Sequence, residues 1–196
     1  PKAAIEDGQG GGNAVPVDMK EVIAQAAMKL LIEKHAKKLT VKDIVEECHI
    51  TRQTFYYHFA DIPEMFRWIL EQQGQRALLE AKAQAGGEKG LRCLFVMALE
   101  AMPYLRRVER TPYGEELQRM VAQSIQNIFE KIIEEKGLYA QCSRGEIKLI
   151  LRYHVGAILG LFQSWGPEDT QNLDTIVHTV FLLMTEGISP QEGANL

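Results

Sequence analysis

The chain has 196 residues, of which 46% are hydrophobic and 24% charged, with a formal net charge of −4 at pH 7. This length suits one compact unit or two small ones, and the hydrophobic content is that of an ordinary globular protein. The negative balance gives no overall argument for nucleic-acid binding. The chain has an odd number of cysteines, and they are widely spaced: Cys48, Cys93 and Cys142. This pattern argues against a disulfide framework and for a reducing compartment.

No apolar run approaches the roughly 20 residues that span a bilayer, and no signal peptide is visible. We therefore expect a soluble cytoplasmic protein without membrane contact. Residues 1–16 hold a glycine-rich stretch from Gly8 to Asn13 and are expected to form a flexible tail outside the fold. A first helix is predicted over 18–35, where Asp18 can cap it and apolar residues recur at helical spacing.

The segment over 40–59, TVKDIVEECHITRQTFYYHF, has the layout of a helix-turn-helix. Thr40 can cap a short helix by accepting a bond from a backbone N–H one turn on. An apolar face follows it at helical spacing: Val41, Ile44, Val45 and Cys48. His49 and Ile50 break this pattern, and Thr51 can cap a second helix over 52–59. The N-terminal unit is predicted over 17–62.

The second of these helices has two faces of different chemistry, with Phe55 and Phe59 on the apolar one. The other face carries side chains that can bond a base edge or a phosphate: Arg52, Gln53, Thr54, Tyr56, Tyr57 and His58. A short helix with an aromatic anchor and a polar outer face fits a DNA major groove. The alternative is the plain surface of a small domain, but adjacent tyrosines suit a binding face better than a solvent face.

With these residues the chain resembles the TetR/AcrR family of transcriptional regulators, over roughly residues 19–72. The matching positions are Thr40-Val41, Asp43-Ile44, Ile50-Thr51, Thr54-Phe55-Tyr56 and His58-Phe59. Within the family, the recognition helix and the stretch from Tyr153 to Trp165 are similar to a subgroup that regulates dihydroxyacetone kinase operons.

The resemblance implies an all-α homodimer, in which an N-terminal three-helix helix-turn-helix DNA-binding domain sits on a C-terminal helical ligand-binding and dimerisation domain. By position it implies phosphate contacts from Thr51, Thr54, Tyr56 and His58, and base-edge contacts from Arg52, Gln53 and Tyr57. Thr40 is included in the same DNA-binding set. Arg52 and Gln53 suit guanine and adenine edges respectively.

Two departures from the family pattern concern the DNA-binding unit. The family usually has a phosphate-binding Lys at the start of the fourth helix, where this chain has Asp61-Ile62-Pro63-Glu64. The usual Ala-Gly before the turn is replaced by Cys48-His49, which puts a side chain where glycine reaches a positive φ easily. Cys48-His49 has no second Cys or His at ligand spacing, so no metal site is expected.

A C-terminal helical domain is predicted over 63–190. It begins with a connecting helix over 63–85, which starts at Pro63 and stops at Gly86-Gly87. Further helices are predicted over about 88–108, 113–136, 143–165 and 170–186, the third from a capping box of Ser143 and Glu146. No segment alternates with a period of two, so no sheet is expected.

The last two helices carry apolar ladders that fit either a dimer interface or packing within one subunit, and periodicity alone leaves both open. Because members of the resembled family pair through their last two helices into a four-helix bundle, we expect the interface to include Leu161, Trp165, Ile176, Val180 and Phe181. Candidates for an effector pocket are Met97, Met120, His154 and Phe162. Plain core packing is the alternative for the pocket set.

The sequence contains no nucleotide-binding loop, nucleophile elbow or zinc-protease motif, so neither an enzyme nor a bound cofactor or metal is expected. The favoured interpretation is a homodimeric, sequence-specific transcriptional regulator of double-stranded DNA, controlled by a small-molecule effector or a regulatory protein at its C-terminal domain. The alternative is a dimeric protein-interaction module with weak or lost DNA binding. The missing Lys supports this alternative, and the retained recognition helix opposes it.

Overall fold

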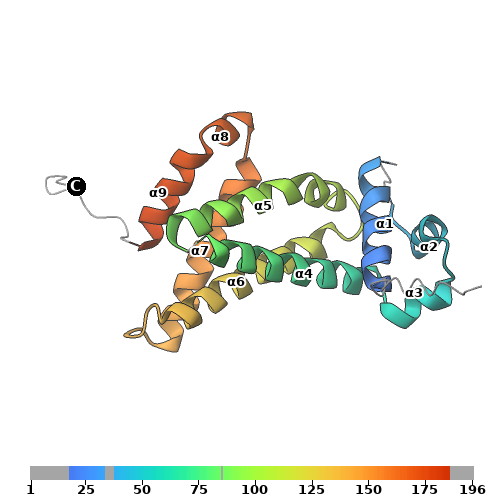
Figure 1. Cartoon of the computed structure of the whole chain (residues 1–196), viewed down its shortest axis with the longest axis horizontal. Helices are drawn as coiled ribbons and strands as arrows, with labels where there is room; N and C mark the ends of the chain where they lie inside the picture. The colour runs from blue at the N-terminus through green and yellow to red at the C-terminus, as the bar shows by residue number, and fades with distance from the viewer. Residues whose placement is uncertain (1–17, 34–37, 85, 186–196) are drawn as a thin grey trace, which may run out of the picture.

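The computed structural model describes residues 18–33, 38–84 and 86–185, and within these ranges the chain forms nine α-helices and no strand. The predicted tail at 1–16 and the predicted domain end at 186–190 lie outside the described residues. Figure 1 shows an elongated molecule, with α1 to α3 at one end and α4 to α9 forming the rest. The predicted all-α class is confirmed.

The N-terminal unit consists of α1 (Met19–Glu33), α2 (Val41–Cys48) and α3 (Arg52–His58). These helices meet on a common apolar core, formed by Ile23, Ala27, Leu31, Leu39, Ile44, Phe55 and Phe59, all of which are buried. The helix-turn-helix that the motif predicted is therefore held in place by the apolar face of α1.

Helix α4 (Ile62–Ala83) joins this unit to the rest of the molecule. The Asp61 side chain caps it by accepting a bond from the Glu64 backbone N–H at 2.7 Å, and Pro63 occupies the first turn as predicted. Its first turn is buried in the N-terminal core through Ile62, Met65 and Phe66. Further along, the helix packs against α5 (Gly87–Val108) and α6 (Gly114–Lys136).

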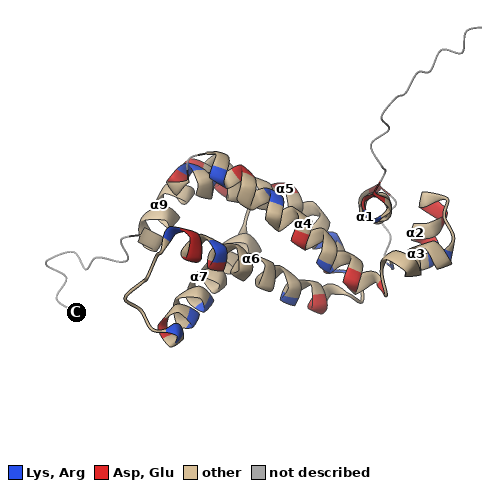
Figure 2. Cartoon of the chain, turned by 60° about the horizontal axis from the view of Figure 1, so that its bottom comes forward, with Lys and Arg blue, Asp and Glu red and all other residues tan. Residues whose placement is uncertain are grey.

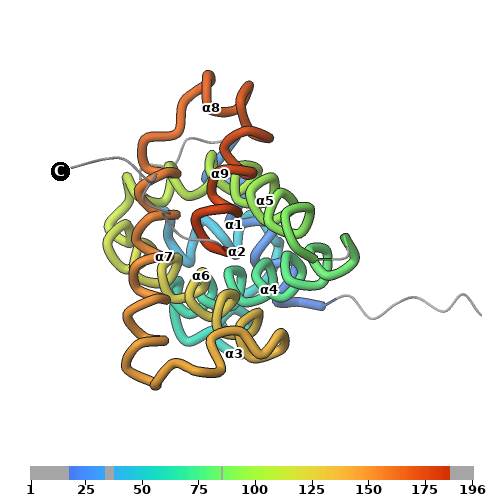
Figure 3. The backbone as a smooth tube through the Cα atoms, turned by 90° about the vertical axis from the view of Figure 1, so that its left-hand side faces the viewer, coloured from blue at the N-terminus to red at the C-terminus, as the bar shows by residue number. Residues whose placement is uncertain are grey.

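The ends of the longer helices follow local signals in the sequence. Gly86 and Gly87 both have positive φ and separate α4 from α5. Gly137, at φ 60°, ends α6 in the left-handed conformation that glycine adopts easily. Ser143 and Glu146 form the predicted capping box at the start of α7 (Arg144–Ser164). Figure 3 shows α7 along one edge of this part and α5 along the opposite edge.

The predicted single helix at 170–186 is instead two helices, α8 (Pro167–Gln171) and α9 (Leu173–Thr185). Pro167 starts α8 three residues before the predicted position. The break falls at Asn172, whose side-chain amide donates to the Glu168 carbonyl at 3.1 Å. Asn side chains favour such local bonds with the backbone over a continuous helix. The apolar ladder begins only at Leu173, after the break, so periodicity alone did not reveal the turn.

The structure has two hydrophobic cores. The second contains Phe95, Phe162, Trp165 and Val180 and lies within the C-terminal helices, whereas the N-terminal core crosses the predicted domain boundary. Val108 and Leu117, from the two sides of the α5–α6 turn, are buried in the same core as the helix-turn-helix. The turn itself is closed by Thr111, whose hydroxyl donates to the Val108 carbonyl at 2.6 Å. The DNA-proximal end of the C-terminal helices is thus part of the platform on which α1 and α4 rest.

Candidate nucleic-acid interface

Helix α2 is fixed at its start by reciprocal capping. The Thr40 hydroxyl accepts from the Asp43 backbone N–H at 3.2 Å, and the Asp43 carboxylate accepts from the Thr40 backbone N–H at 3.1 Å. The same hydroxyl donates to the Asp43 carboxylate at 2.6 Å. Thr40, predicted as a DNA contact, therefore has a structural role already, because its hydroxyl is engaged with Asp43.

The turn between α2 and α3 is made by a histidine in a conformation that favours glycine. His49 has φ 57° and ψ 40°, in the left-handed region, and its backbone N–H donates to the Glu46 carbonyl. Its side chain is exposed. The turn of the resembled family is thus kept without its glycine, at the cost of backbone strain. Beside it, Cys48 is half-buried, and burial raises the pKa of its thiol.

Helix α3 is positioned from both ends. Thr51 caps it, since its hydroxyl accepts from the Thr54 backbone N–H at 3.1 Å. Phe55 and Phe59, with exposed fractions of 0% and 1%, anchor the inner face in the core. Their ring centroids lie 6.0 Å apart, and Trp68 of α4 packs edge-on against Phe59. A seven-residue helix is too short to be stable alone, so these anchors determine its orientation.

The outer face of α3 brings together the side chains that the sequence predicted for DNA contact. Tyr57 is 85% exposed and Tyr56 is 56% exposed, although both are aromatic. Thr51, Arg52 and Gln53 are also exposed, and Thr54 and His58 are half-exposed. The ring of Tyr57 lies edge-on to that of His58 at 5.0 Å. These residues therefore form one continuous polar and aromatic surface.

The charge on this surface is low but positive. Arg52 is the one formally charged residue of α3 apart from a protonatable histidine, and Figure 2 shows α3 mostly free of both charge colours. Lys29 on α1 pairs with Glu47 at 2.7 Å, and Lys42 with Glu46 at 3.7 Å. Within the described residues Arg52 has no ion-pair partner, so its guanidinium is available to a ligand.

The four residues predicted for an effector pocket are not gathered in one core of the structure. Met120 packs on the N-terminal core, whereas Phe162 is buried in the second core with Phe95 and Trp165. His154 is half-buried on α7, where it stacks on Phe129 at 6.4 Å, and burial lowers the pKa of its imidazole. Met97, on α5, is half-buried.

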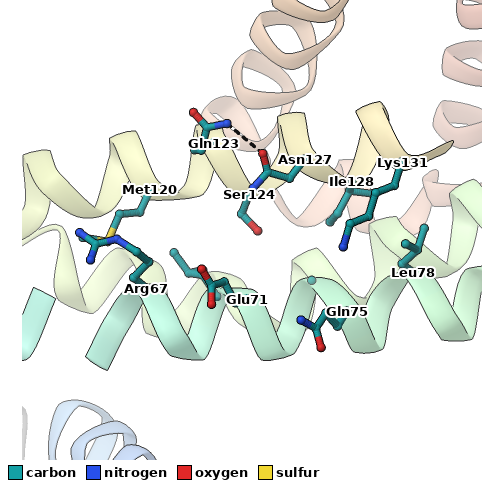
Figure 4. A pocket seen from close by; sticks show the side chains of 12 residues that line it. Arg67, Glu71, Gln75, Leu78, Met120, Gln123, Ser124, Asn127, Ile128 and Lys131 are labelled. Carbon is teal, nitrogen blue, oxygen red and sulfur yellow. Dashed lines mark hydrogen bonds between the residues drawn. The ribbon is translucent and has the colours of Figure 1, made fainter. Parts of the chain in front are cut away.

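A cavity of about 170 Å³ instead lies between α4 and α6. Figure 4 shows Glu71 and Lys131 extending into it from opposite helices, with Arg67 and Met120 at one end. Its polar lining consists of Arg67, Glu71, Gln75, Gln123, Ser124, Asn127 and Lys131. Of the predicted pocket residues only Met120 lines it. Sequence periodicity could not find this site, because it mixes polar and apolar residues of two helices that are far apart in the sequence.

The residues predicted for a dimer interface lie mainly within the subunit. Trp165 and Val180 are buried in the second core, and Leu161, Ile176 and Phe181 pack against it. Trp165 also donates its indole N–H to Thr170 at 3.0 Å. Packing inside one chain therefore buries Trp165 and Val180, whereas Leu161, Ile176 and Phe181 stay partly exposed. A different stripe on α7 is exposed and contains Leu149, Tyr153, Gly156, Ala157 and Gly160.

In the part of the chain that the structure describes, no group of three or more His, Cys, Asp or Glu side chains is arranged to hold a metal ion. A search of the described helices also finds none that is long and apolar enough to cross a membrane.

Comparison with known proteins agrees with this geometry. Residues 23–68, which cover most of α1, all of α2 and α3, and the first turns of α4, match the family model of the bacterial regulatory proteins, tetR family. The fold is similar to that of the dihydroxyacetone kinase operon activator DhaS, with a TM-score of 0.60 and 22% identity over 86% of this chain and 95% of that one. The N-terminal helix-turn-helix unit therefore matches the TetR family model, and the fold of the whole chain is similar to those of solved TetR-family regulators.

A second TetR-like structure, of a protein from Shewanella sp. PV-4 assigned to the tetR transcription regulators, has a TM-score of 0.58 and 16% identity over 83% of this chain and 95% of that one. At these identities the likeness shows the fold and not a shared ligand or target. No curated protein matches the chain significantly in sequence. The match over residues 23–68 supports the coarse class of a DNA-binding transcription regulator.

Proposed function

We propose that the protein is a sequence-specific transcriptional repressor or activator that binds operator DNA as a homodimer and responds to an effector at its C-terminal helices. The observation that carries the DNA-binding part is the outer face of α3. Arg52, Gln53, Tyr56 and Tyr57 are all exposed on one side of a helix whose opposite side is anchored by Phe55. Such a helix fits the major groove, with half-sites about 34 Å apart or at a multiple of that spacing in a dimer.

The test is to select bound sequences from a random pool of DNA duplexes and then to measure affinity for the selected duplex by fluorescence anisotropy. Specific, salt-dependent binding that Tyr56→Ala weakens is the expected result. Leu79→Ala is the matched control, because Leu79 is 67% exposed on α4 and lies outside α3. Random selection makes the result independent of where the operator lies in a genome.

Recovery of no preferred sequence, together with equally weak binding to all duplexes, would favour the alternative function. In that case the helix-turn-helix would be a scaffold, and the protein would act by docking a partner protein. The low charge of α3 is the feature that supports this alternative. The exposure of two adjacent tyrosines is the feature that opposes it, because protein surfaces seldom keep such a pair without a ligand.

For the homodimer, the exposed stripe of α7 is the surface that we assign to the second copy. Leu149 and Tyr153 are 57% and 63% exposed, and a Cβ added at Gly156 or Gly160 would meet no atom within 4 Å. Small residues at this spacing let two helices approach closely, and the flanking apolar side chains would then be removed from water.

Leu149→Arg and Tyr153→Arg should convert the dimer to a monomer in sedimentation equilibrium. Leu79→Arg introduces the same side chain at a comparably exposed leucine on α4 and should leave the dimer intact. Dimers in all three variants would place the interface elsewhere, whereas a monomeric wild-type protein would remove the dimer from the proposal altogether.

For effector control, the cavity between α4 and α6 is our candidate site. It is smaller than the roughly 300–1,000 Å³ typical of drug-sized ligands, so a small metabolite with both apolar and polar groups is the class that fits its volume and mixed lining. At the crossing of the two helices, a Cβ added at Gly74 would come within 3.3 Å of the Ser124 hydroxyl. A ligand that separates the helices there would move α4, which carries the helix-turn-helix.

This assignment can be tested without knowing the ligand, by filling the cavity. Ser124→Trp should change the affinity for the selected duplex in the absence of any effector, because the indole imitates an occupant. Gln118→Trp, at an exposed position of α6 outside the cavity lining, is the control. An affinity equal to wild type for Ser124→Trp, in a protein that melts normally, would argue against coupling between this cavity and α3.

A further inference from the structure

The start of α4 presents anions to the DNA side of the molecule. Asp61 accepts from the Glu64 backbone N–H, and the Glu64 carboxylate accepts from the Ala60 backbone N–H. Ile62, in the segment where the family usually has its phosphate-binding Lys, is only 3% exposed and packs in the N-terminal core. A helix start with two carboxylates repels a phosphate although its dipole would attract one. If the protein contacts a DNA phosphate near this point, the positive charge must therefore come from another element.

A cation from a different helix lies at this junction. The Lys20 ammonium, on the first turn of α1, is 5.2 Å from the centroid of the Phe59 ring. Phe59 is the residue that ends α3. Figure 1 shows this end of α1 beside the junction of α3 and α4. An aromatic face attracts an ammonium without neutralising it, so Phe59 positions the charge and leaves it active.

The ammonium of Lys20 differs from those of its neighbours. Lys29 and Lys42 are each paired with a glutamate, whereas Lys20 has no ion-pair partner within the described residues. Of the two acids nearest in the sequence, Asp18 accepts from the Lys20 backbone N–H at 2.9 Å, and Glu21 accepts from the Gln25 side-chain amide at 3.2 Å. Lys20 is also half-exposed. It thus combines a fixed position, a full charge and access to solvent.

We propose that Lys20 binds a backbone phosphate of DNA at the C-terminal end of α3, in place of the cation that α4 lacks. The inference rests on the proposed DNA-binding function. A helix in a major groove about 12 Å wide has phosphates along both of its sides, and contacts to them fix the register of the protein on the duplex. Thr51 lies at the N-terminal end of α3, so Lys20 gives the helix a second contact at its other end.

The experiment compares wild type, Lys20→Met, Lys20→Arg and Lys29→Met in duplex binding between 50 and 200 mM salt. Loss of one phosphate contact makes the negative slope of log affinity against log salt shallower by about 0.9. The ratio of wild-type to Lys20→Met affinity should therefore fall about 3.5-fold between the lowest and the highest salt concentration. The loss should be equal on selected and random duplexes, because a phosphate carries no sequence information. Lys20→Arg should restore the wild-type slope.

Lys29→Met removes one positive charge from the same helix at a position already paired with Glu47, and it should keep the wild-type slope. An equal change of the salt slope in Lys20→Met and Lys29→Met would overturn the proposal, since the loss of one positive charge anywhere on α1 would then explain both results. A wild-type slope in a folded Lys20→Met would overturn it as well. If Lys20→Met does not fold, Lys20→Gln decides by the same criteria. Wild-type protein that binds no duplex at all would refute the proposed function itself, an outcome distinct from these.

Discussion

The hydroxyls of Thr51 and Thr54 lie 2.9 Å apart, and the Thr51 hydroxyl also accepts from the Thr54 backbone N–H. Two residues expected to contact phosphates are thus bonded to each other in the free protein. The start of the recognition helix is therefore already ordered before DNA arrives, which reduces the entropy lost on binding.

Replacement of Thr51 by Ala should lower the free energy of unfolding by about 1 kcal/mol, because the first turn of α3 loses its cap. Thr51→Ser keeps the capping oxygen and should remain near wild type. Urea denaturation followed by circular dichroism measures both. If the two variants were equally destabilised, the methyl group of Thr51 and not its hydroxyl would be the stabilising part.

His49→Gly should stabilise the fold by up to about 1 kcal/mol. A left-handed conformation costs a non-glycine residue roughly 1–2 kcal/mol, and the extra freedom of glycine in the unfolded chain offsets about 0.4–1 kcal/mol of the gain. The same denaturation assay applies, with His49→Ala as the control that keeps the strain. A lower stability for His49→Gly would mean that the exposed imidazole makes a compensating interaction.

Tyr57→Ala and Phe55→Ala should separate binding from folding. Tyr57 is 85% exposed and Phe55 is 0% exposed on the same helix. The first change should alter stability by no more than about 0.5 kcal/mol while weakening DNA binding. The second should cost about 3–5 kcal/mol of stability through the cavity that it leaves. Thermal melts and anisotropy on the same samples give both readings, and normal DNA affinity in Tyr57→Ala would exclude Tyr57 from the interface.

Arg52→Ala should cost about 1–3 kcal/mol of binding free energy on the selected duplex and relax the sequence preference at one position. The reason is that a guanidinium without an ion-pair partner in the described part of the chain can bind a guanine edge in bidentate fashion. Competition with duplexes that carry single base changes measures this. A uniform loss on every sequence would identify Arg52 as a phosphate contact instead.

The stability of the protein should fall as the pH is lowered from 7 to 5, partly through His154. Burial lowers the pKa of this imidazole in the folded protein, so the unfolded chain takes up the proton more readily. Its contribution is therefore complete above the unfolded pKa of about 6.5 and is lost below it. His154→Phe, which can keep the stacking on Phe129, should show a smaller drop in melting temperature between pH 7 and pH 5. Equal drops would mean that His154 is protonated as easily folded as unfolded.

Much of the DNA-binding unit follows from the sequence by itself. The caps at Thr40 and Thr51, the anchors Phe55 and Phe59, and the glycine stop at Gly137 act within one or two turns of chain. Signals of such short range can be read without knowing the neighbours, because the interacting groups are adjacent in sequence. The order of the helices and the exposed side of α3 were predictable for this reason.

The tertiary structure decided what covers each apolar face. Periodicity marks Trp165 and Val180 as members of apolar stripes, but only the packing of α5, α7 and α9 shows that they belong to one subunit's core. In the same way, Met120 and Phe162 looked equivalent in the sequence and lie in different cores. The contact between Lys20 and Phe59 joins residues 39 positions apart, and local spacing contains no information about such pairs. Helical patterns determine which side of a helix is buried, whereas the partner on that side is determined by the folded chain as a whole.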